Sequence, residues 1–279
     1  MKNVAFVLSG GGNRGAMEVG VLRELLGAGI RPDIVVGASV GAINAAAIAA
    51  YPGEEGALWL DKLWRGVTKK DVMPNNYLSM VWRFATGERG LFSNDNLRDF
   101  LWSNFPCDVR RFSDISAAEL YITAVELETQ RLHVFGRERS ESILDAIMAS
   151  CALPVILAPW HYRGHQYIDG GMICDLPVRV AIEQGAKEIY AIDVGMRRAA
   201  RWIARGIFRN IGLIIDSLGR RQAVEELAWA RKLPDVDIHY IRLDGFQLVR
   251  IWDFSHTTEM IEEGMRAGRR HLLERGLAY

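Results

Sequence analysis

The sequence predicts an α/β fold in which a mostly parallel sheet carries helices on both faces. Near the N-terminus, strand-length apolar runs at 3–8 and 33–37 alternate with helical patterns, so the order is strand, helix, strand, helix. Both runs are apolar nearly throughout rather than alternating, as in strands that are covered on both sides. The second helix, which starts at Ser39, is rich in small residues that pack closely against a sheet. Together these observations favour a parallel sheet between two layers of helices.

The next elements follow from the same patterns. The first helix is predicted over 16–29, because its leucines recur at helical spacing and Gly27 and Gly29 close it. Residues 52–112 hold four of the tryptophans and several helical patterns, and they contain no clear strand. We therefore expect a helical insertion beside the sheet.

The sheet pattern resumes after the insertion. Further apolar runs predict strands at 119–129, 131–136, 165–171, 187–195 and 235–245, the first two forming a hairpin. Helical patterns cover 140–154, 177–186 and 257–276. Ser140 or Ser142 is expected to start the first of these helices and Pro154 to end it, while Pro177 opens the second. The segment "HYRGH", 161–165, is expected to be a loop.

Length and composition limit the classes of protein to which this chain can belong. The 279 residues are expected to form a single domain, 1–279, with the insertion at about 52–112 and a C-terminal helical part at about 197–232. Lys plus Arg and Asp plus Glu both total 34, and this neutral balance argues against nucleic acid as a partner. No apolar run is long enough for a membrane span.

Localisation is predicted from the N-terminus and the cysteines. The first apolar run is short and interrupted by glycines, unlike that of a signal peptide. Cys107, Cys151 and Cys174 are far apart and lack metal-ligand spacing, so we expect reduced thiols that serve mainly in core packing. Both features favour a cytoplasmic protein.

The stretch "VLSGGGNRGAMEVGVL", 7–22, raises the question of what the glycines bind. Gly10, Gly12 and Gly15 match the fingerprint of a dinucleotide-binding loop, which also requires an acidic residue at the end of the second strand. That strand ends in glycine, and Asp33 stands at its beginning. No Lys-Ser or Lys-Thr pair follows the glycines either, so a phosphate cradle is the last-ranked interpretation.

A second motif, "GASVG" at 37–41, occupies the end of the second strand, where the dinucleotide fingerprint would require an acidic residue. It is a G-x-S-x-G sequence between a strand and a helix, the context of a nucleophile elbow. The following helix directs the positive end of its dipole at Ser39. Ser39 is thus the candidate nucleophile, with an ordinary tight turn as the alternative.

If Ser39 is a nucleophile, the glycine loop is a candidate oxyanion hole. Acyl transfer passes through an oxyanion that fixed backbone N–H groups stabilise. In a parallel sheet this loop and the serine turn emerge at the same edge, so Gly11 and Gly12 are candidate donors. Arg14 holds the loop or attracts an anionic head group, unless it makes only a surface ion pair.

A serine nucleophile requires a base. None of the six histidines follows an evident central strand. Asp169, in "YIDGG", ends an apolar strand and is followed by two glycines that leave room for a partner. From the residues alone, a catalytic base and an ordinary Asp-Gly turn remain equally open.

Three motifs together carry a resemblance. "GGGNRG" at 10–15, "GASVG" at 37–41 and "DGG" at 169–171 occur in the order typical of the patatin-like phospholipase family, which the chain resembles over roughly 3–195. The resemblance implies a three-layer α/β/α sandwich and a Ser39–Asp169 dyad without histidine. It further implies an oxyanion hole from the Gly-rich loop, Gly10, Gly11 and Gly12, supported by Arg14, with no metal or cofactor.

The implied function is a lipid acyl hydrolase that cleaves fatty acyl esters of phospholipids or related lipids. A small-ester hydrolase or acyltransferase on the same dyad is the first alternative. A lipid-binding regulatory protein without turnover is the second.

An arginine-rich stretch at 197–221 has two interpretations. Tryptophan, phenylalanine and isoleucine alternate there with seven arginines, as in helices that lie at a membrane surface. The other interpretation is a core helix with a solvated basic face. An enzyme acting on lipids favours the first, as peripheral membrane contact.

Overall fold

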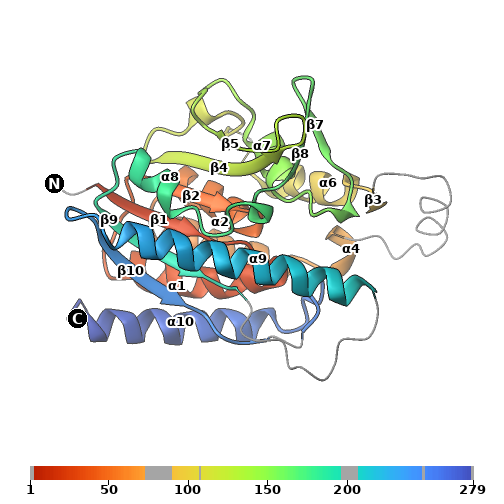
Figure 1. Ribbon diagram of the computed structural model, residues 1–279. Coiled ribbons are helices and arrows are strands. Elements are labelled where there is room, and N and C mark those ends of the chain that lie inside the picture. Colours follow the sequence, from red (N-terminus) through yellow and green to blue (C-terminus); the bar gives the residue numbers. More distant parts are fainter. Residues whose placement is uncertain (1–2, 73–89, 107, 196–206, 247–248, 278–279) are drawn as a thin grey trace.

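The computed structural model describes residues 3–72, 90–106, 108–195, 207–246 and 249–277. An eight-stranded sheet crosses the molecule, with helices on both of its faces (Figure 1). The predicted α/β class and three-layer sandwich are confirmed. Within the described ranges, no helix is both long enough and apolar enough to cross a bilayer.

The sheet is parallel in one part and antiparallel in the other. Its strand order is β10-β9-β1-β2-β4-β8-β7, and β5 also pairs with β4. The parallel strands are β1 Val4–Leu8, β2 Ile34–Ala38, β4 Glu119–Glu126, β9 Glu188–Asp193 and β10 Asp237–Arg242. The antiparallel strands are β5 Arg131–Phe135, β7 Trp160–Tyr162 and β8 His165–Asp169. The sheet is therefore mixed, with its parallel part formed by the strands that the apolar runs predicted.

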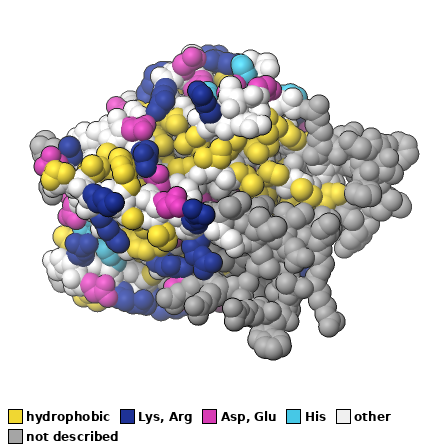
Figure 2. Space-filling model, in the orientation of Figure 1, with side chains coloured by type: hydrophobic (Ala, Val, Ile, Leu, Met, Phe, Trp, Pro, Cys, Tyr) yellow, Lys and Arg dark blue, Asp and Glu magenta, His cyan; other side chains and the backbone are white. Residues whose placement is uncertain are grey.

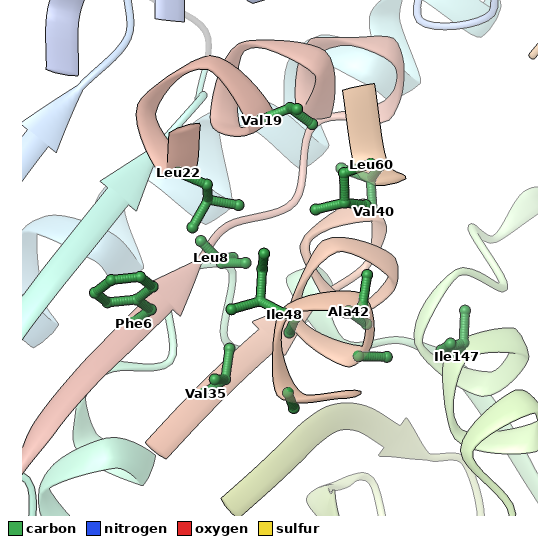
Figure 3. Close-up of a cluster of buried hydrophobic side chains, with 14 of the residues drawn as sticks. Phe6, Leu8, Val19, Leu22, Val35, Val40, Ala42, Ile48, Leu60 and Ile147 are labelled. Carbon is green, nitrogen blue, oxygen red and sulfur yellow. The ribbon is translucent and has the colours of Figure 1, made fainter. Parts of the chain in front are cut away.

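Alternating side chains of the central strand build two cores. Phe6 and Leu8 of β1 face one layer, while Ala5 and Val7 face the other. The first layer consists of α1 Gly15–Gly27, α2 Val40–Ala50 and α10 Thr257–Glu274. The second layer consists of α8 Val178–Glu183 and α9 Ile207–Ala230. Figure 3 shows how Leu8 and Ile48 meet in the first core. Because side chains on both faces of β1 and β2 are buried, these two strands are apolar on both faces.

The described part of the insertion, which leaves out 73–89 and 107, is mainly helical, but the expectation that it lacks a strand is wrong. Its helices are α3 Glu54–Gly66, α4 Lys69–Val72 and α6 Asp95–Asn104. A short strand, β3 Gly90–Phe92, pairs in parallel with β6 Val155–Leu157 in a separate two-stranded sheet. Three residues are too few to show a periodicity, so neither strand was predicted.

Two further elements differ in detail from the predictions. The segment at 161–165 is a tight β7–β8 hairpin rather than an open loop, with Tyr162 paired to His165. Helix α7, Ile143–Ser150, ends before Pro154, and Ser142 caps its start by accepting a hydrogen bond from the backbone N–H of Asp145. Of the predicted C-terminal helical part, 196–206 lies outside the described residues.

Candidate active site

Ser39 occupies the sharp turn between β2 and α2. Its backbone angles are φ 53° and ψ −127°, a conformation in which few residues other than glycine are found. At Gly41, a Cβ atom would lie 2.5 Å from the carbonyl oxygen of Leu8. The glycine is therefore required by the close approach of β1, and the turn presents the Ser39 side chain at the end of β2.

Asp169, at the end of β8, lies beside this serine. The Ser39 hydroxyl donates a hydrogen bond of 2.7 Å to Asp169 Oδ2, and the backbone N–H of Gly171 donates one of 2.8 Å to Oδ1. Strand β4 lies between the two parent strands, pairing Thr123 with Ala38 and Ala124 with Asp169. The structure thus brings together two residues that lie 130 positions apart in the sequence.

Burial changes the acidity of this carboxyl group. Asp169 is only 4% exposed, and desolvation raises its pKa to about 6, against the lowering effect of the hydrogen bonds from Ser39 and Gly171. A carboxylate with this pKa is still mostly ionised at neutral pH. It is also a stronger base than an exposed aspartate.

A buried serine that the sequence analysis missed holds the backbone of the turn. Ser150 Oγ accepts a hydrogen bond of 2.7 Å from the Ser39 N–H and donates one of 2.7 Å to the carbonyl oxygen of Thr123. Ser150 is fully buried at the end of α7. Only the tertiary fold brings this helix end to the turn, so no local pattern marks Ser150 as part of the site.

The glycine loop lies against the same serine. A Cβ on Gly10 would lie 3.1 Å from Ser39 Cβ and 2.6 Å from Asp175 Oδ1. The N–H of Gly10 is already engaged, since it donates to Asp175 Oδ1 at 3.2 Å and to the Asp175 carbonyl at 3.3 Å. In the part of the chain that the structure describes, the N–H groups of Gly11 and Gly12 donate to no other protein group.

Arg14 supports the loop from inside the protein. The side chain is 4% exposed, and its Nε donates a hydrogen bond of 3.1 Å to the carbonyl oxygen of Gly11. The interpretation of Arg14 as a mere surface ion pair is wrong, because the guanidinium is buried against the loop. This contact fixes the orientation of the peptide that joins Gly11 to Gly12.

A cavity of about 250 Å³ opens beside Ser39 and Asp169. Its apolar wall comes mainly from α2, α3, α6 and two loops, and consists of Val40, Ile43, Leu63, Trp64, Val67, Val72, Leu97, Phe100, Leu101, Cys151, Leu153, Ile156, Leu157, Ile251, Trp252 and Phe254. Charged side chains border it as well, namely Arg14, Asp175, Asp193, Arg220 and Arg242. The site therefore combines a serine hydroxyl, a carboxylate bonded to it and two backbone N–H groups without a partner among the described residues, with room for an apolar chain.

Other candidate groups lie away from this cavity. None of the six histidines lines it. Glu126, Glu128 and His165 come within 4.8 Å of one another on the surface, but His165 Nδ1 bonds to Glu126 Oε1 at 2.6 Å and Glu128 accepts the N–H of Gln166. Cys174 is buried as expected, whereas Cys151 lines the cavity in addition to packing against the core.

The chain is similar in sequence to known proteins. The family model described as patatin-like phospholipase matches residues 6–182. Patatin-like phospholipase domain-containing protein 7 of Mus musculus is 32% identical over 198 residues, which are 70% of this chain and 14% of that protein. Lysophospholipase NTE1 of Phaeosphaeria nodorum is 29% identical over 207 residues, which are 70% of this chain and 12% of that protein. The chain thus spans less than a fifth of the length of either relative.

A solved structure has a similar fold. VipD from Legionella pneumophila superposes with a TM-score of 0.55 and 13% sequence identity, covering 98% of this chain and 67% of that one. At this identity the similarity concerns the fold alone.

Proposed function

Because this chain belongs to the patatin-like phospholipase family, we propose that it hydrolyses fatty acyl esters of phospholipids or related lipids. One observation carries the proposal. The Ser39 hydroxyl lies 2.7 Å from a buried Asp169 carboxylate at the wall of a largely apolar cavity. This arrangement is suited to nucleophilic attack on an ester whose chain lies among apolar side chains.

In the proposed first step, Ser39 Oγ attacks the ester carbonyl carbon while its proton passes to Asp169 Oδ2. The hydrogen bond between these atoms is short enough for direct transfer. The carbonyl oxygen becomes an oxyanion as the new C–O bond forms. When the intermediate collapses, the alcohol leaves with the proton held by Asp169, and the acyl group stays on Ser39.

The oxyanion requires donors that are aligned before the reaction. We propose the N–H groups of Gly11 and Gly12 for this role, since the N–H of Gly10 is engaged by Asp175. Gly10 then serves by its lack of a side chain, because a Cβ there would crowd Ser39 and Asp175. Each aligned donor is worth about 3 kcal/mol in the barrier.

In the second step, Asp169 accepts a proton from water, which attacks the acyl carbonyl and releases the fatty acid. Ser39 recovers its proton as the tetrahedral intermediate breaks down. No further base is needed, because the same carboxylate alternates between its two protonation states.

The cavity wall favours long acyl chains over small esters. Its many apolar side chains gain contact with each methylene group that enters, at about 0.8 kcal/mol per buried CH₂. One relative is named a lysophospholipase. We propose that the substrate of this chain is likewise a phospholipid with a single acyl chain.

We also propose peripheral contact with a membrane through 197–221. The described part of this stretch ends in Arg220 and Arg221, which are exposed, and Val224 follows on the same helix with 59% of its surface exposed. Figure 2 shows hydrophobic and basic side chains next to each other on the face that carries α8 and α9. Such a surface suits an anionic lipid interface. The free thiols Cys151 and Cys174 favour a cytoplasmic location.

The test combines labelling with hydrolysis. A fluorophosphonate probe should label the wild-type protein at Ser39, and Ser39→Ala should lose both labelling and ester hydrolysis. Asp169→Asn should lower kcat by about 10²–10⁴-fold, as expected when a general base is removed.

Exposed residues of the same types provide matched controls. Ser255→Ala and Asp95→Asn change exposed groups that do not line the cavity, and they should leave hydrolysis unchanged. Retained hydrolysis in Ser39→Ala or Asp169→Asn would contradict the dyad. Binding of lipid vesicles without any turnover would favour a regulatory protein instead.

A further inference from the structure

We propose that Arg220 and Arg242 form a subsite for the phosphate group of a lipid substrate, an inference that rests on the proposed acyl hydrolase function. Both arginines border the cavity that contains Ser39 and Asp169. The apolar side of this cavity accounts for an acyl chain but not for the polar part of a lipid. The charged side chains at the border of the cavity have no role in binding the acyl chain.

Arg242 is placed by the sheet. It ends β10, where it pairs with Asp193 of β9, one position beyond the level at which Ile192 pairs with Leu8. The glycine loop leaves β1 directly after this level, so Arg242 and the loop share one edge of the sheet. Its Nε donates to Asp244 Oδ1 at 3.1 Å, and its side chain is 29% exposed. Among the described residues, no hydrogen bond engages the two terminal nitrogens of this guanidinium, so they can serve as donors.

Arg220 is placed by α9. A Cβ on the preceding residue, Gly219, would lie 3.2 Å from Asp175 Cβ. Asp175 in turn contacts Gly10, which lies against Ser39. Arg220 itself lines the same cavity as Ser39 and Asp175. It is exposed and makes no ion pair within the described residues.

The neighbouring carboxylates are occupied by their own partners. Asp193 accepts hydrogen bonds from the Tyr240 hydroxyl at 2.6 Å and from the Gly195 N–H at 2.8 Å. Asp175 accepts the Gly10 N–H. Asp244 also bonds to Arg242, so removal of either arginine leaves these carboxylates in excess over the remaining guanidinium. Loss of either arginine should therefore weaken the binding of a phosphate.

The chemistry of the ligand follows from this geometry. When the ester carbonyl lies at Ser39 and the acyl chain among the apolar side chains, the alcohol part of the lipid must point to the charged border. Guanidinium groups bind phosphate through paired N–H donors. A glycerophospholipid with one acyl chain carries a phosphate in its alcohol part, whereas a monoacylglycerol with the same chain does not. The subsite should therefore favour the former.

The experiment compares hydrolysis of these two lipids at concentrations low enough for both to remain monomeric rather than form micelles. For Arg220→Ala and for Arg242→Ala, the ratio of kcat/KM for the lysophospholipid to kcat/KM for the monoacylglycerol should fall about tenfold, the typical effect of losing a charged hydrogen bond. Arg266→Ala is the matched control, because Arg266 is exposed on α10, pairs with Glu262 and Glu263 and does not line the cavity. Its ratio should equal that of the wild type.

A binding measurement separates this inference from the proposed function. In the Ser39→Ala background, titration with the lysophospholipid should show about tenfold weaker binding in the arginine variants, whether or not the wild type turns it over. Hydrolysis of neither lipid by the wild type would contradict the proposed function alone. Unchanged ratios and unchanged binding in the Arg220 and Arg242 variants, or an equal change in Arg266→Ala, would overturn the phosphate subsite.

Discussion

The backbone N–H of Ser39 donates a 2.7 Å hydrogen bond to Ser150 Oγ, a group 111 positions away in the sequence. The acceptor lies on α7, the helix that precedes the strands leading to Asp169. Because Ser39 has a positive φ, its turn needs such support from the surrounding structure. The same helix end therefore helps to keep the Ser39 hydroxyl oriented toward Asp169.

Ser150→Ala is expected to impair both stability and activity. The change leaves the buried N–H of Ser39 without its acceptor, which costs about 1–3 kcal/mol, and it loosens the turn, which should lower kcat about tenfold. Urea unfolding and ester hydrolysis measure the two effects.

Ser142→Ala on the same helix is the matched control. Ser142 caps the start of α7, so its loss should cost about 1 kcal/mol of stability and leave kcat unchanged. Equal kcat values in the two variants would show that Ser150 has no role in orienting Ser39.

The rate should depend on pH through Asp169. Its pKa of about 6 means that the base is protonated, and inactive, in acid. We expect kcat/KM to rise tenfold per pH unit below this value, to reach half its maximum near pH 6 and to become constant above about pH 7. The residual hydrolysis of Asp169→Asn should lack this transition, and a wild-type midpoint near pH 4 would contradict the effect of burial.

The same pKa predicts a variant that is inactive but more stable. The folded protein binds the Asp169 proton more tightly than the unfolded chain, whose pKa is about 3.8. This contribution to the free energy of unfolding is complete below pH 4 and is lost as the pH rises through 6, a change of about 3 kcal/mol. Asp169→Asn removes the buried charge, so it should be more stable than the wild type at pH 7 and similar to it at pH 3.5.

Asp114→Asn should show the opposite sign. Hydrogen bonds from the N–H groups of Arg111 and Arg110 lower the pKa of Asp114, so its charge stabilises the fold at neutral pH. Urea unfolding at both pH values measures the two variants. A stability gain for Asp114→Asn at pH 7, or none for Asp169→Asn, would contradict the argument from linkage.

The sequence predicted where Asp169 lies, but for an incomplete reason. An apolar strand followed by glycines suggested the carboxyl edge of a parallel sheet. Strand β8 is in fact antiparallel to β4, and Asp169 comes level with Ser39 because Ala124 and Thr123 are neighbours on β4. Strand direction depends on contacts between distant segments, which an apolar run does not specify.

The motif residues were predictable because each imposes a local geometry. G-x-S-x-G requires a tight strand-to-helix turn, and the helix after it showed the small residues of a buried helix. Ser150, Arg220 and Arg242 belong to ordinary helices and a strand end. Their place in the site arises from packing alone, so only the structure reveals them.

Gly12→Ala is expected to damage the oxyanion loop. Gly12 has φ +60°, and a Cβ there would lie 2.9 Å from Ile251 Cβ and 3.0 Å from the Ile251 carbonyl oxygen. The loop must shift to relieve this contact, which misplaces a proposed donor and should lower kcat about 10²-fold. Single-turnover measurements with an activated ester test this.

Gly29→Ala separates strain from function. Gly29 also has a positive φ, +81°, but no atom lies within 4 Å of the position of its Cβ. The variant should lose about 1 kcal/mol of stability and no activity. If both variants lost stability equally and kept full activity, the glycine loop would have no part in catalysis.

Phe100→Ala should weaken the preference for long acyl chains. Phe100 lies on α6 and lines the cavity, so its removal takes contact area from a bound chain. We expect kcat/KM for a long-chain ester to fall about tenfold, in line with the loss of a buried aromatic contact, and that for a short-chain ester to change much less. The dependence of kcat/KM on chain length is the measurement.

Trp102→Ala is the control, because Trp102 stands two residues further on the same helix, is 56% exposed and stacks on Arg110 rather than lining the cavity. A parallel loss for both chain lengths in Phe100→Ala would mean that α6 supports the fold of the site without contacting the acyl chain.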